Sequence, residues 1–182
     1  ARVAVIGTGW WATTAHLPAL KAHPDAEVVA IADKRPDVLA FQTEILDEDT
    51  EVTGQVTVKL WISSTAIDTD FTAKLIDVYP PNEDYPDGYR MNLSDTILRC
   101  RYRNSWNEPE MMVPGQIYPI TITLHATSNL FKTGHRIRLD ISSSNFPRLD
   151  INPNTGEPMG RHTHKVIAQN TVHLDSTRPS HL

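Results

Sequence analysis

The sequence has a single cysteine, no long apolar run and no excess of positive charge. Cys100 is the only cysteine among 182 residues, so no internal disulfide can form and a reducing compartment is compatible with the chain. No apolar stretch approaches the roughly 18–20 residues that a membrane-spanning helix needs. The first apolar stretch ends at Gly7, too early for the core of a signal peptide. We therefore expect a cytoplasmic protein with no membrane partner.

The charge balance also excludes a class of partner. The net charge is −5, which argues against nucleic acid or an anionic membrane surface as the main partner. Hydrophobic residues make up 40% of the chain and charged residues 21%, a balance typical of a folded globular protein. The length suits one domain, or one domain with a small attachment. We interpret Cys100 as a small buried hydrophobic residue rather than a nucleophile.

The first 34 residues predict a β-α-β unit. Residues 3–6 and 27–32 are short apolar strands, and the second is apolar on both faces, as strands covered on both sides are. Residues 10–22 between them show helical spacing of apolar side chains. About 34 residues is less than usually folds alone, so this unit needs cover from elsewhere.

A glycine turn joins the first strand to this helix. Gly7, Gly9 and Ala12 occupy the three positions of a G-x-G-x-x-A turn, in which a backbone free of Cβ atoms approaches a pyrophosphate at a helix N-terminus. Asp33 ends the second strand, where an acid that binds a ribose hydroxyl is expected. The alternative is that the glycines only shape a turn and the aspartate only ends a strand.

The stretches "VAVIGTGWWATTAHLPAL" and "AEVVAIAD" resemble the start of the Gfo/Idh/MocA family of NAD(P)-dependent oxidoreductases. The resemblance implies that Gly7, Gly9 and Trp10 line the pyrophosphate and that Asp33 contacts the adenosine ribose. It covers about a fifth of the chain, and that family's catalytic Glu-Lys-Pro motif does not occur in this sequence. We therefore expect a truncated Rossmann unit with a vestigial site, no hydride transfer, and no cofactor unless this fragment binds NAD(P).

From residue 35 onward the pattern changes to period-two alternation between turn-rich connections. The alternation predicts a set of core-facing side chains: Val56, Val58, Leu60, Ile120, Ile122, Leu124, Ile137, Leu139 and Ile141. It also places Phe71, Ala73 and Leu75 on one face of a further strand. It places Thr57, Lys59, Arg136 and Arg138 on the more exposed side.

Little helix is expected in this second section. One short helix is predicted over residues 94–102, with Ser94 as its N-cap. Several alternating strands with long turn-rich connections indicate an antiparallel sandwich. The fold class is therefore mainly β, with an N-terminal β-α-β fragment over residues 1–34 and a sandwich domain over residues 35–182.

Three groups of polar residues are candidate sites. The serines at 142–144 have no G-x-S-x-G elbow around them and are read as strand or turn residues. His162 and His164 in "GRHTHK" could share a face toward a metal, but no cysteine or clear acid completes the set, so we interpret them as solvated loop histidines. Asp68 and Asp70 are expected to make capping and turn hydrogen bonds, with a calcium site as the alternative.

The second section also carries a family resemblance. Its stretches, in order, are "RPDVLAFQTEILDEDTEVTG", "DTDFTAKLIDVYP", "ILRCRYRNSW", "FKTGHRIRLDISSSNFPRLDINPNTGE" and "NTVHLDSTRPSHL". Together they closely resemble the C-terminal domain of the X-Pro dipeptidyl-peptidase and cocaine-esterase-like (CocE/NonD) serine hydrolases. The resemblance implies a jelly-roll, galactose-binding-like sandwich that lies against an α/β-hydrolase domain and helps to shape the substrate cleft. The Ser-Asp-His triad belongs to that other domain.

These two resemblances imply a non-catalytic accessory domain that is inactive alone. Its expected partner is an α/β-hydrolase catalytic domain, and we expect no catalytic or metal-binding residue in this chain. Residues 33–35 then look like a seam between two unrelated families. Two alternatives stay open at this point. One is an NAD(P)-binding oxidoreductase fragment, and the other is a carbohydrate-binding-like module, since related sandwiches bind sugars.

Overall fold

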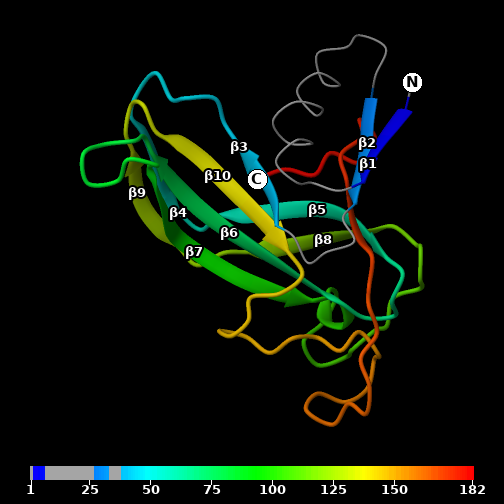
Figure 1. Cartoon of the computed structure of the whole chain (residues 1–182). Helices are drawn as coiled ribbons and strands as arrows, with labels where there is room; N and C mark the ends of the chain where they lie inside the picture. The colour runs from blue at the N-terminus through cyan, green and yellow to red at the C-terminus, as the bar shows by residue number, and fades with distance from the viewer. Residues whose placement is uncertain (1, 7–26, 33–37) are drawn as a thin grey trace.

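The computed structural model describes the backbone of residues 2–6 and 27–32 and the whole of residues 38–182 (Figure 1). Apart from one short 3-10 turn, the regular secondary structure of these residues consists of strands. The strands are β1 (Arg2–Ile6), β2 (Glu27–Ala32), β3 (Leu39–Gln42), β4 (Thr50–Gly54), β5 (Thr57–Ser64), β6 (Asp70–Tyr79), β7 (Tyr89–Arg99), β8 (Tyr118–Thr123), β9 (Thr127–Phe131), β10 (Arg136–Ser142) and β11 (Asn170–His173). In this part of the chain, no helix is long and apolar enough to cross a membrane.

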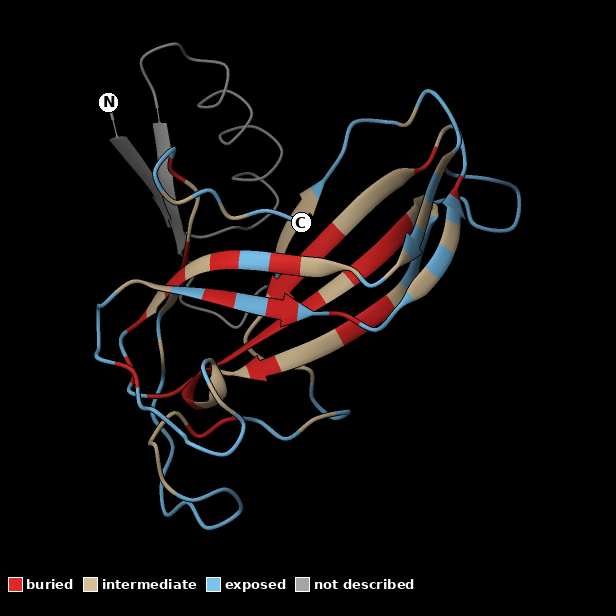
Figure 2. Cartoon of the chain, turned by 180° about the vertical axis from the view of Figure 1, so that it is seen from behind, coloured by how far each residue is buried: buried red, intermediate tan, exposed pale blue. Residues whose placement is uncertain are grey.

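Two sheets form the layers of the molecule. One has the strand order β1-β2-β11-β5-β8 and the other has the order β3-β10-β6-β7, while β4 and β9 pair as a separate ribbon. Every described pairing is antiparallel except that of β1 with β2. Figures 1 and 2 show β10 and β6 on one side and β5 and β8 on the other, with one apolar core built from both layers. The prediction of a mainly β, antiparallel sandwich is confirmed.

The alternation of buried and exposed side chains along β5 and β8 matches the prediction. Val58, Leu60 and Ile62 are buried, while Lys59 between them is exposed (Figure 2). On β8 and just after it, Ile120, Ile122 and Leu124 are likewise buried. Because successive side chains of a strand point to opposite faces, one sheet face packs in the core and the other meets water.

The central strands of the second sheet are buried on both faces. Leu75 and Leu139 pair across β6 and β10 and face the core, which confirms the prediction for Leu139. On the opposite face Thr72 and Asp140 are also buried. Arg136 and Arg138 lie on the face opposite the core, as predicted. They are half-buried rather than freely exposed, so this face is partly covered.

The predicted helix over residues 94–102 is wrong. Residues 94–99 continue β7 and pair with β6, from Ser94 opposite Leu75 to Arg99 opposite Asp70. Only Cys100–Tyr102 forms a short 3-10 turn, and the hydroxyl of Ser94 donates to the backbone carbonyl of His125 instead of capping a helix. Pairing with β6 satisfies the backbone N–H and C=O groups of this segment, and this outweighs the helix-like spacing of its apolar side chains.

Cys100 lies in the core, as predicted. It is fully buried among apolar side chains of both sheets, and this burial raises the pKa of its thiol. A thiol held protonated in apolar surroundings is a structural group rather than a nucleophile.

Both predicted N-terminal strands are present. β1 and β2 pair in parallel, and β2 also pairs antiparallel with β11, through Ala30, Ile31 and Ala32. The N-terminal strands therefore extend the sandwich sheet by two further strands. The predicted helix over residues 10–22 lies outside the described residues, and a domain boundary at residue 35 stays a prediction.

Candidate functional site

The predicted dinucleotide site lies outside the described residues. This applies to each of its members, Gly7, Gly9, Trp10, Ala12 and Asp33. Their role toward NAD(P) stays a prediction.

The serines at 142–144 are strand-end and turn residues, as predicted. Ser142 ends β10, and its hydroxyl lies 2.6 Å from that of Thr72. The hydroxyl of Ser143 accepts a hydrogen bond from the amide of Asn170 at 2.7 Å. These hydroxyls join neighbouring segments of the sandwich, and none is paired with a histidine.

A serine and a histidine do meet elsewhere, on β5 and β11. The Ser63 hydroxyl lies 3.0 Å from Nε2 of His173. Partial burial, together with nearby Arg178, lowers the pKa of His173. Asp175, two residues further on, accepts bonds from Thr177 and pairs with Arg178 instead of orienting the imidazole. Since general-base activation of a serine needs an oriented histidine, this geometry is a cross-strand contact rather than a triad.

His162 and His164 are exposed loop residues, as predicted. Nδ1 of His164 lies 3.5 Å from a carboxylate oxygen of Glu157. Hydrogen bonds from Thr163 and Thr155 lower the pKa of that glutamate, so the carboxylate is engaged by its own loop. Among the described residues, no group of three or more histidine, cysteine or acidic side chains is placed to hold a metal ion.

The expectation for Asp68 and Asp70 is wrong: they form long-range buried ion pairs instead of local turn bonds. Asp68 is 0% exposed and accepts from Nε of Arg101 at 2.8 Å and from the backbone N–H of the same residue at 2.9 Å. Asp70 is 1% exposed and accepts two hydrogen bonds from the guanidinium of Arg99, at 2.9 and 3.0 Å. Both carboxylates therefore have charged donors about thirty residues further along the chain.

Asn152 joins the two pairs into one cluster. Its amide donates to Oδ2 of Asp68 at 2.9 Å and to Oδ1 of Asp70 at 2.7 Å. Burial raises the pKa of Asp70, against the opposing effect of Arg99. The same contact with Asp70 raises the pKa of Arg99. Paired and hydrogen-bonded in this way, the buried charges are compensated.

This cluster holds three connections together at one end of the sandwich. We name residues 65–69, 100–117 and 143–169 the loop face (bottom of Figure 1). Across it, the backbone N–H of Met112 donates to the carbonyl of Ile67 at 2.8 Å, and Arg101 donates to the carbonyl of Glu157 at 3.2 Å. The three connections therefore form one joined surface rather than separate loops.

The loop face carries large apolar side chains in contact with water. They are Ile67, Trp106, Met111, Val113, Phe146, Ile151, Met159, Val166 and Ile167. Ile167 is 86% exposed, Trp106 is 75% exposed and Phe146 is 67% exposed. Exposed apolar groups gathered in one region mark interaction surfaces. This surface was not predicted from the sequence, although connections as long as 100–117 and 143–169 are themselves a signal of function.

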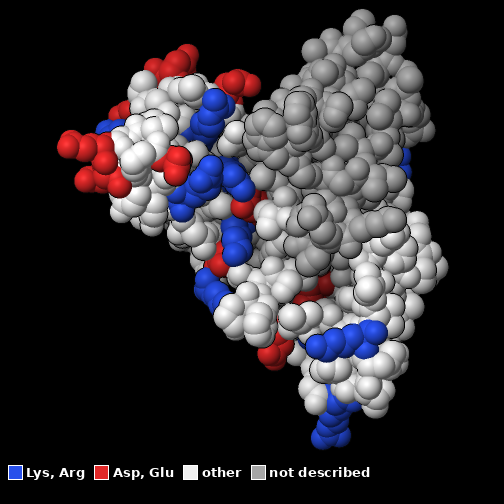
Figure 3. Space-filling view, viewed as in Figure 1, with Lys and Arg blue, Asp and Glu red and all other residues white. Residues whose placement is uncertain are grey.

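Several charged groups on and beside the outer face of the β3-β10-β6-β7 sheet form ion pairs within the chain. Figure 3 shows Lys and Arg side chains gathered along this face. Arg138 donates two hydrogen bonds to Asp140, and Arg148 pairs with Asp95. Carboxylates of the same chain therefore compensate these two arginines.

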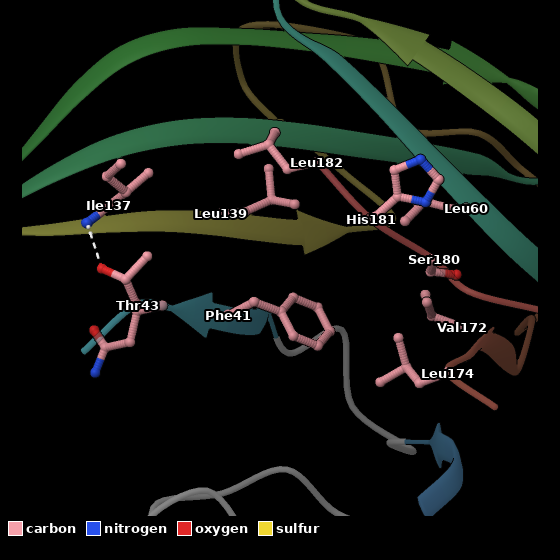
Figure 4. A pocket seen from close by; sticks show the side chains of 11 residues that line it. Phe41, Thr43, Leu60, Ile137, Leu139, Val172, Leu174, Ser180, His181 and Leu182 are labelled. Carbon is pink, nitrogen blue, oxygen red and sulfur yellow. Dashed lines mark hydrogen bonds between the residues drawn. The ribbon is translucent and has the colours of Figure 1, made fainter. Parts of the chain in front are cut away.

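An apolar pocket of about 260 Å³ opens between β3 and β10 on one side and β5 and β11 on the other. Figure 4 shows the side chains that line it: Phe41, Gln42, Thr43, Leu60, Ile137, Leu139, Val172, Leu174, Ser180, His181 and Leu182. The Ser180 hydroxyl is already bonded to the backbone of Trp61 and His173. The pocket therefore offers space for a small apolar group and few free polar contacts.

Comparison with known proteins gives a family match over most of the chain. Residues 9–182 match the model of the X-Pro dipeptidyl-peptidase C-terminal non-catalytic domain. The chain is 45% identical over 158 residues to cocaine esterase from Rhodococcus sp. (strain MB1 Bresler), covering 83% of this chain and 26% of that protein.

Solved structures agree with this match. One is an aminopeptidase from a marine sediment Thaumarchaeota archaeon, with a TM-score of 0.74 and 35% identity. Another is an alpha-amino acid ester hydrolase, with a TM-score of 0.75 and 35% identity. In both cases the similarity covers 80% of this chain and 25% of the other. The chain thus spans about a quarter of the length of these relatives, and it belongs to the family of X-Pro dipeptidyl-peptidase C-terminal non-catalytic domains.

Proposed function

We propose that this chain serves as the accessory sandwich domain of a CocE/NonD-type serine hydrolase and packs against an α/β-hydrolase catalytic domain. The observation that carries the proposal is the family match over residues 9–182. The matched relatives are about four times as long as the region they share with this chain. The match favours this function over a dinucleotide-binding fragment or a carbohydrate-binding module. A cytoplasmic location stays a prediction.

The chemistry of the described residues supports a division of labour with another domain. The Ser63–His173 pair has no acid on its imidazole, and Cys100 is sealed in the core. The relatives bear the names of an esterase, an aminopeptidase and an ester hydrolase, and three-quarters of each lies outside the matched region. In our proposal the parent enzyme cleaves ester or X-Pro peptide bonds with a triad supplied by that other part.

A hydrolysis assay tests this proposal. The full chain is incubated with p-nitrophenyl acetate and with an X-Pro p-nitroanilide, and release of the chromophore is followed against buffer. We expect no turnover above background, because a serine without an oriented base is not activated. Ser63→Ala is the matched control. Turnover that a serine-directed phosphonate abolishes, or that Ser63→Ala removes, would show that the chain is itself a hydrolase.

A further inference from the structure

We infer that the loop face is the surface through which this chain docks on the catalytic domain of its hydrolase. The inference rests on the proposed function and adds to it the location of the contact. It is carried by three observations: where apolar side chains are exposed, how the loops that bear them are held, and how charge is distributed between the two ends of the sandwich.

The first observation is the apolar character of the loop face. Trp106 and Ile167, each at least three-quarters exposed, come from two different connections of this face. At Gly156, a Cβ would lie 2.8 Å from Cδ1 of Ile67 and 3.4 Å from Sδ of Met111, so apolar groups from all three connections meet there. Aromatic and aliphatic anchors of this kind dominate the centres of protein interfaces.

The second observation is that these long connections are held in place from beneath. Asp68, Asp70 and Asn152 bind Arg99, Arg101 and one another below the loop face. Further bonds join the 143–169 connection to itself, as from the N–H of Val166 to the carbonyl of Pro153 at 2.9 Å. A surface that is already ordered loses less conformational entropy when a partner binds.

The third observation is the contrast with the opposite end. We name residues 43–49, 80–88 and 132–135 the acidic end, because its connections read "TEILDED" and "PPNEDYPDG". Figure 3 shows Asp and Glu side chains gathered there. Ile45 and Tyr85 are also exposed at this end, at 59% and 50%, but they stand among acidic side chains. Since the cores of protein interfaces are depleted of charged groups, the acidic end is the poorer candidate for docking.

The occupant follows from the length of the relatives. This chain matches about a quarter of each, so a much larger body accompanies this domain in those proteins. In a CocE/NonD-type hydrolase that body contains the catalytic domain, and the apolar loop face offers it a preformed contact surface.

A binding experiment tests the assignment. The full chain is co-expressed with the part of Rhodococcus cocaine esterase that lies outside the matched 26%, and the two are analysed by size-exclusion chromatography and by titration calorimetry. The variants Trp106→Asp and Ile167→Asp place a charge on the loop face at exposed positions. Leu130→Asp, at a position 44% exposed on β9, is the matched control on the ribbon beside the acidic end. Thermal unfolding of each variant verifies that it folds.

We expect the unaltered chain and Leu130→Asp to co-elute with the esterase part, and the loop-face variants to bind at least about tenfold more weakly. Equal binding by all variants would overturn the docking face while leaving the proposed function intact. Weakening by Leu130→Asp alone would also overturn it, by moving the contact to the other end. Failure of the unaltered chain to associate would overturn the proposed function, and the docking face with it.

Discussion

The two ends of the sandwich handle charge in opposite ways. At the loop face, Asp68 and Asp70 are sealed inside with Arg101 and Arg99. At the acidic end, the pair between Asp49 and Lys132 lies open to water. The first arrangement joins three connections, of which 100–117 and 143–169 are long, whereas the second joins the two short connections 43–49 and 132–135.

Apart from the buried contact of His135 with Asp77, at 2.8 Å, the acidic end is held mainly by local bonds. The side-chain oxygen of Asn82 accepts from the backbone N–H groups of Asp84 and Tyr85, which closes the 80–88 turn on itself. Gly88 lies at φ 74°, where a Cβ would come 2.7 Å from the carbonyl oxygen of Tyr79. A short turn satisfies its own backbone, but a long connection needs side chains from distant parts of the chain.

The largest expected effect comes from breaking the buried cluster. Asp68→Ala leaves Arg101 buried without its carboxylate, and we expect a loss of about 3–5 kcal/mol in the free energy of unfolding. Urea denaturation measures it. The double variant Asp68→Ala with Arg101→Met is the control, because removing both charges should recover much of the loss. A cost below about 1 kcal/mol for Asp68→Ala would remove the contrast between the two ends.

Next in size are truncations in the core that both ends share. Leu75→Ala and Leu139→Ala should each cost about 2–5 kcal/mol, because each leaves a cavity between the sheets. Leu139 borders the apolar pocket, where its neighbours have room to relax, so its cost should be the smaller. Denaturant unfolding of the two variants side by side tests this order. A larger cost for Leu139→Ala would mean that the pocket wall is rigid.

The exposed ion pair between Asp49 and Lys132 at the acidic end should contribute little to the free energy of unfolding. Lys132 and the backbone of Thr133 hold the pKa of Asp49 at about 2, yet both partners are solvated. Lys132→Met should therefore lower the free energy of unfolding far less than Asp68→Ala does, and less still at high salt. Unfolding in low and high salt measures it. A cost as large as that of Asp68→Ala would contradict the distinction between buried and exposed pairs.

The smallest effect concerns pH at the Ser63–His173 contact. The folded state lowers the pKa of His173 below its usual 6.5, so the unfolded chain takes up this proton first. The stability that the neutral imidazole contributes is present above pH 6.5 and is lost as the pH falls through the folded pKa. Melting temperatures between pH 7.5 and 5 should decline less in His173→Gln than in the unaltered chain. An equal decline in both would place the pH dependence elsewhere.

The alternating strands were predictable because the signal lies within each strand. The alternation around Val58, Leu60 and Ile122 follows from the pleat, which sends neighbouring side chains to opposite faces, and it needs no knowledge of the partner strand. The short apolar runs at residues 3–6 and 27–32, which lie in β1 and β2, were recognisable for a similar reason. The family of the sandwich was recognisable from the five stretches in order, and the family match agrees with it.

What the sequence could not show depends on partners that are distant along the chain. The spacing in residues 94–102 permitted a helix, and only pairing with β6 made most of that segment a strand. Asp68 carries no local sign that Arg101 and Asn152, 33 and 84 residues away, will enclose it. The sequence by itself therefore determined which faces of the strands are apolar, since that is a property of neighbouring residues. The buried charges and the loop face above them were decided by the tertiary structure alone, because a charge is retained in a low-dielectric interior only where the fold brings its counter-charge within hydrogen-bond distance.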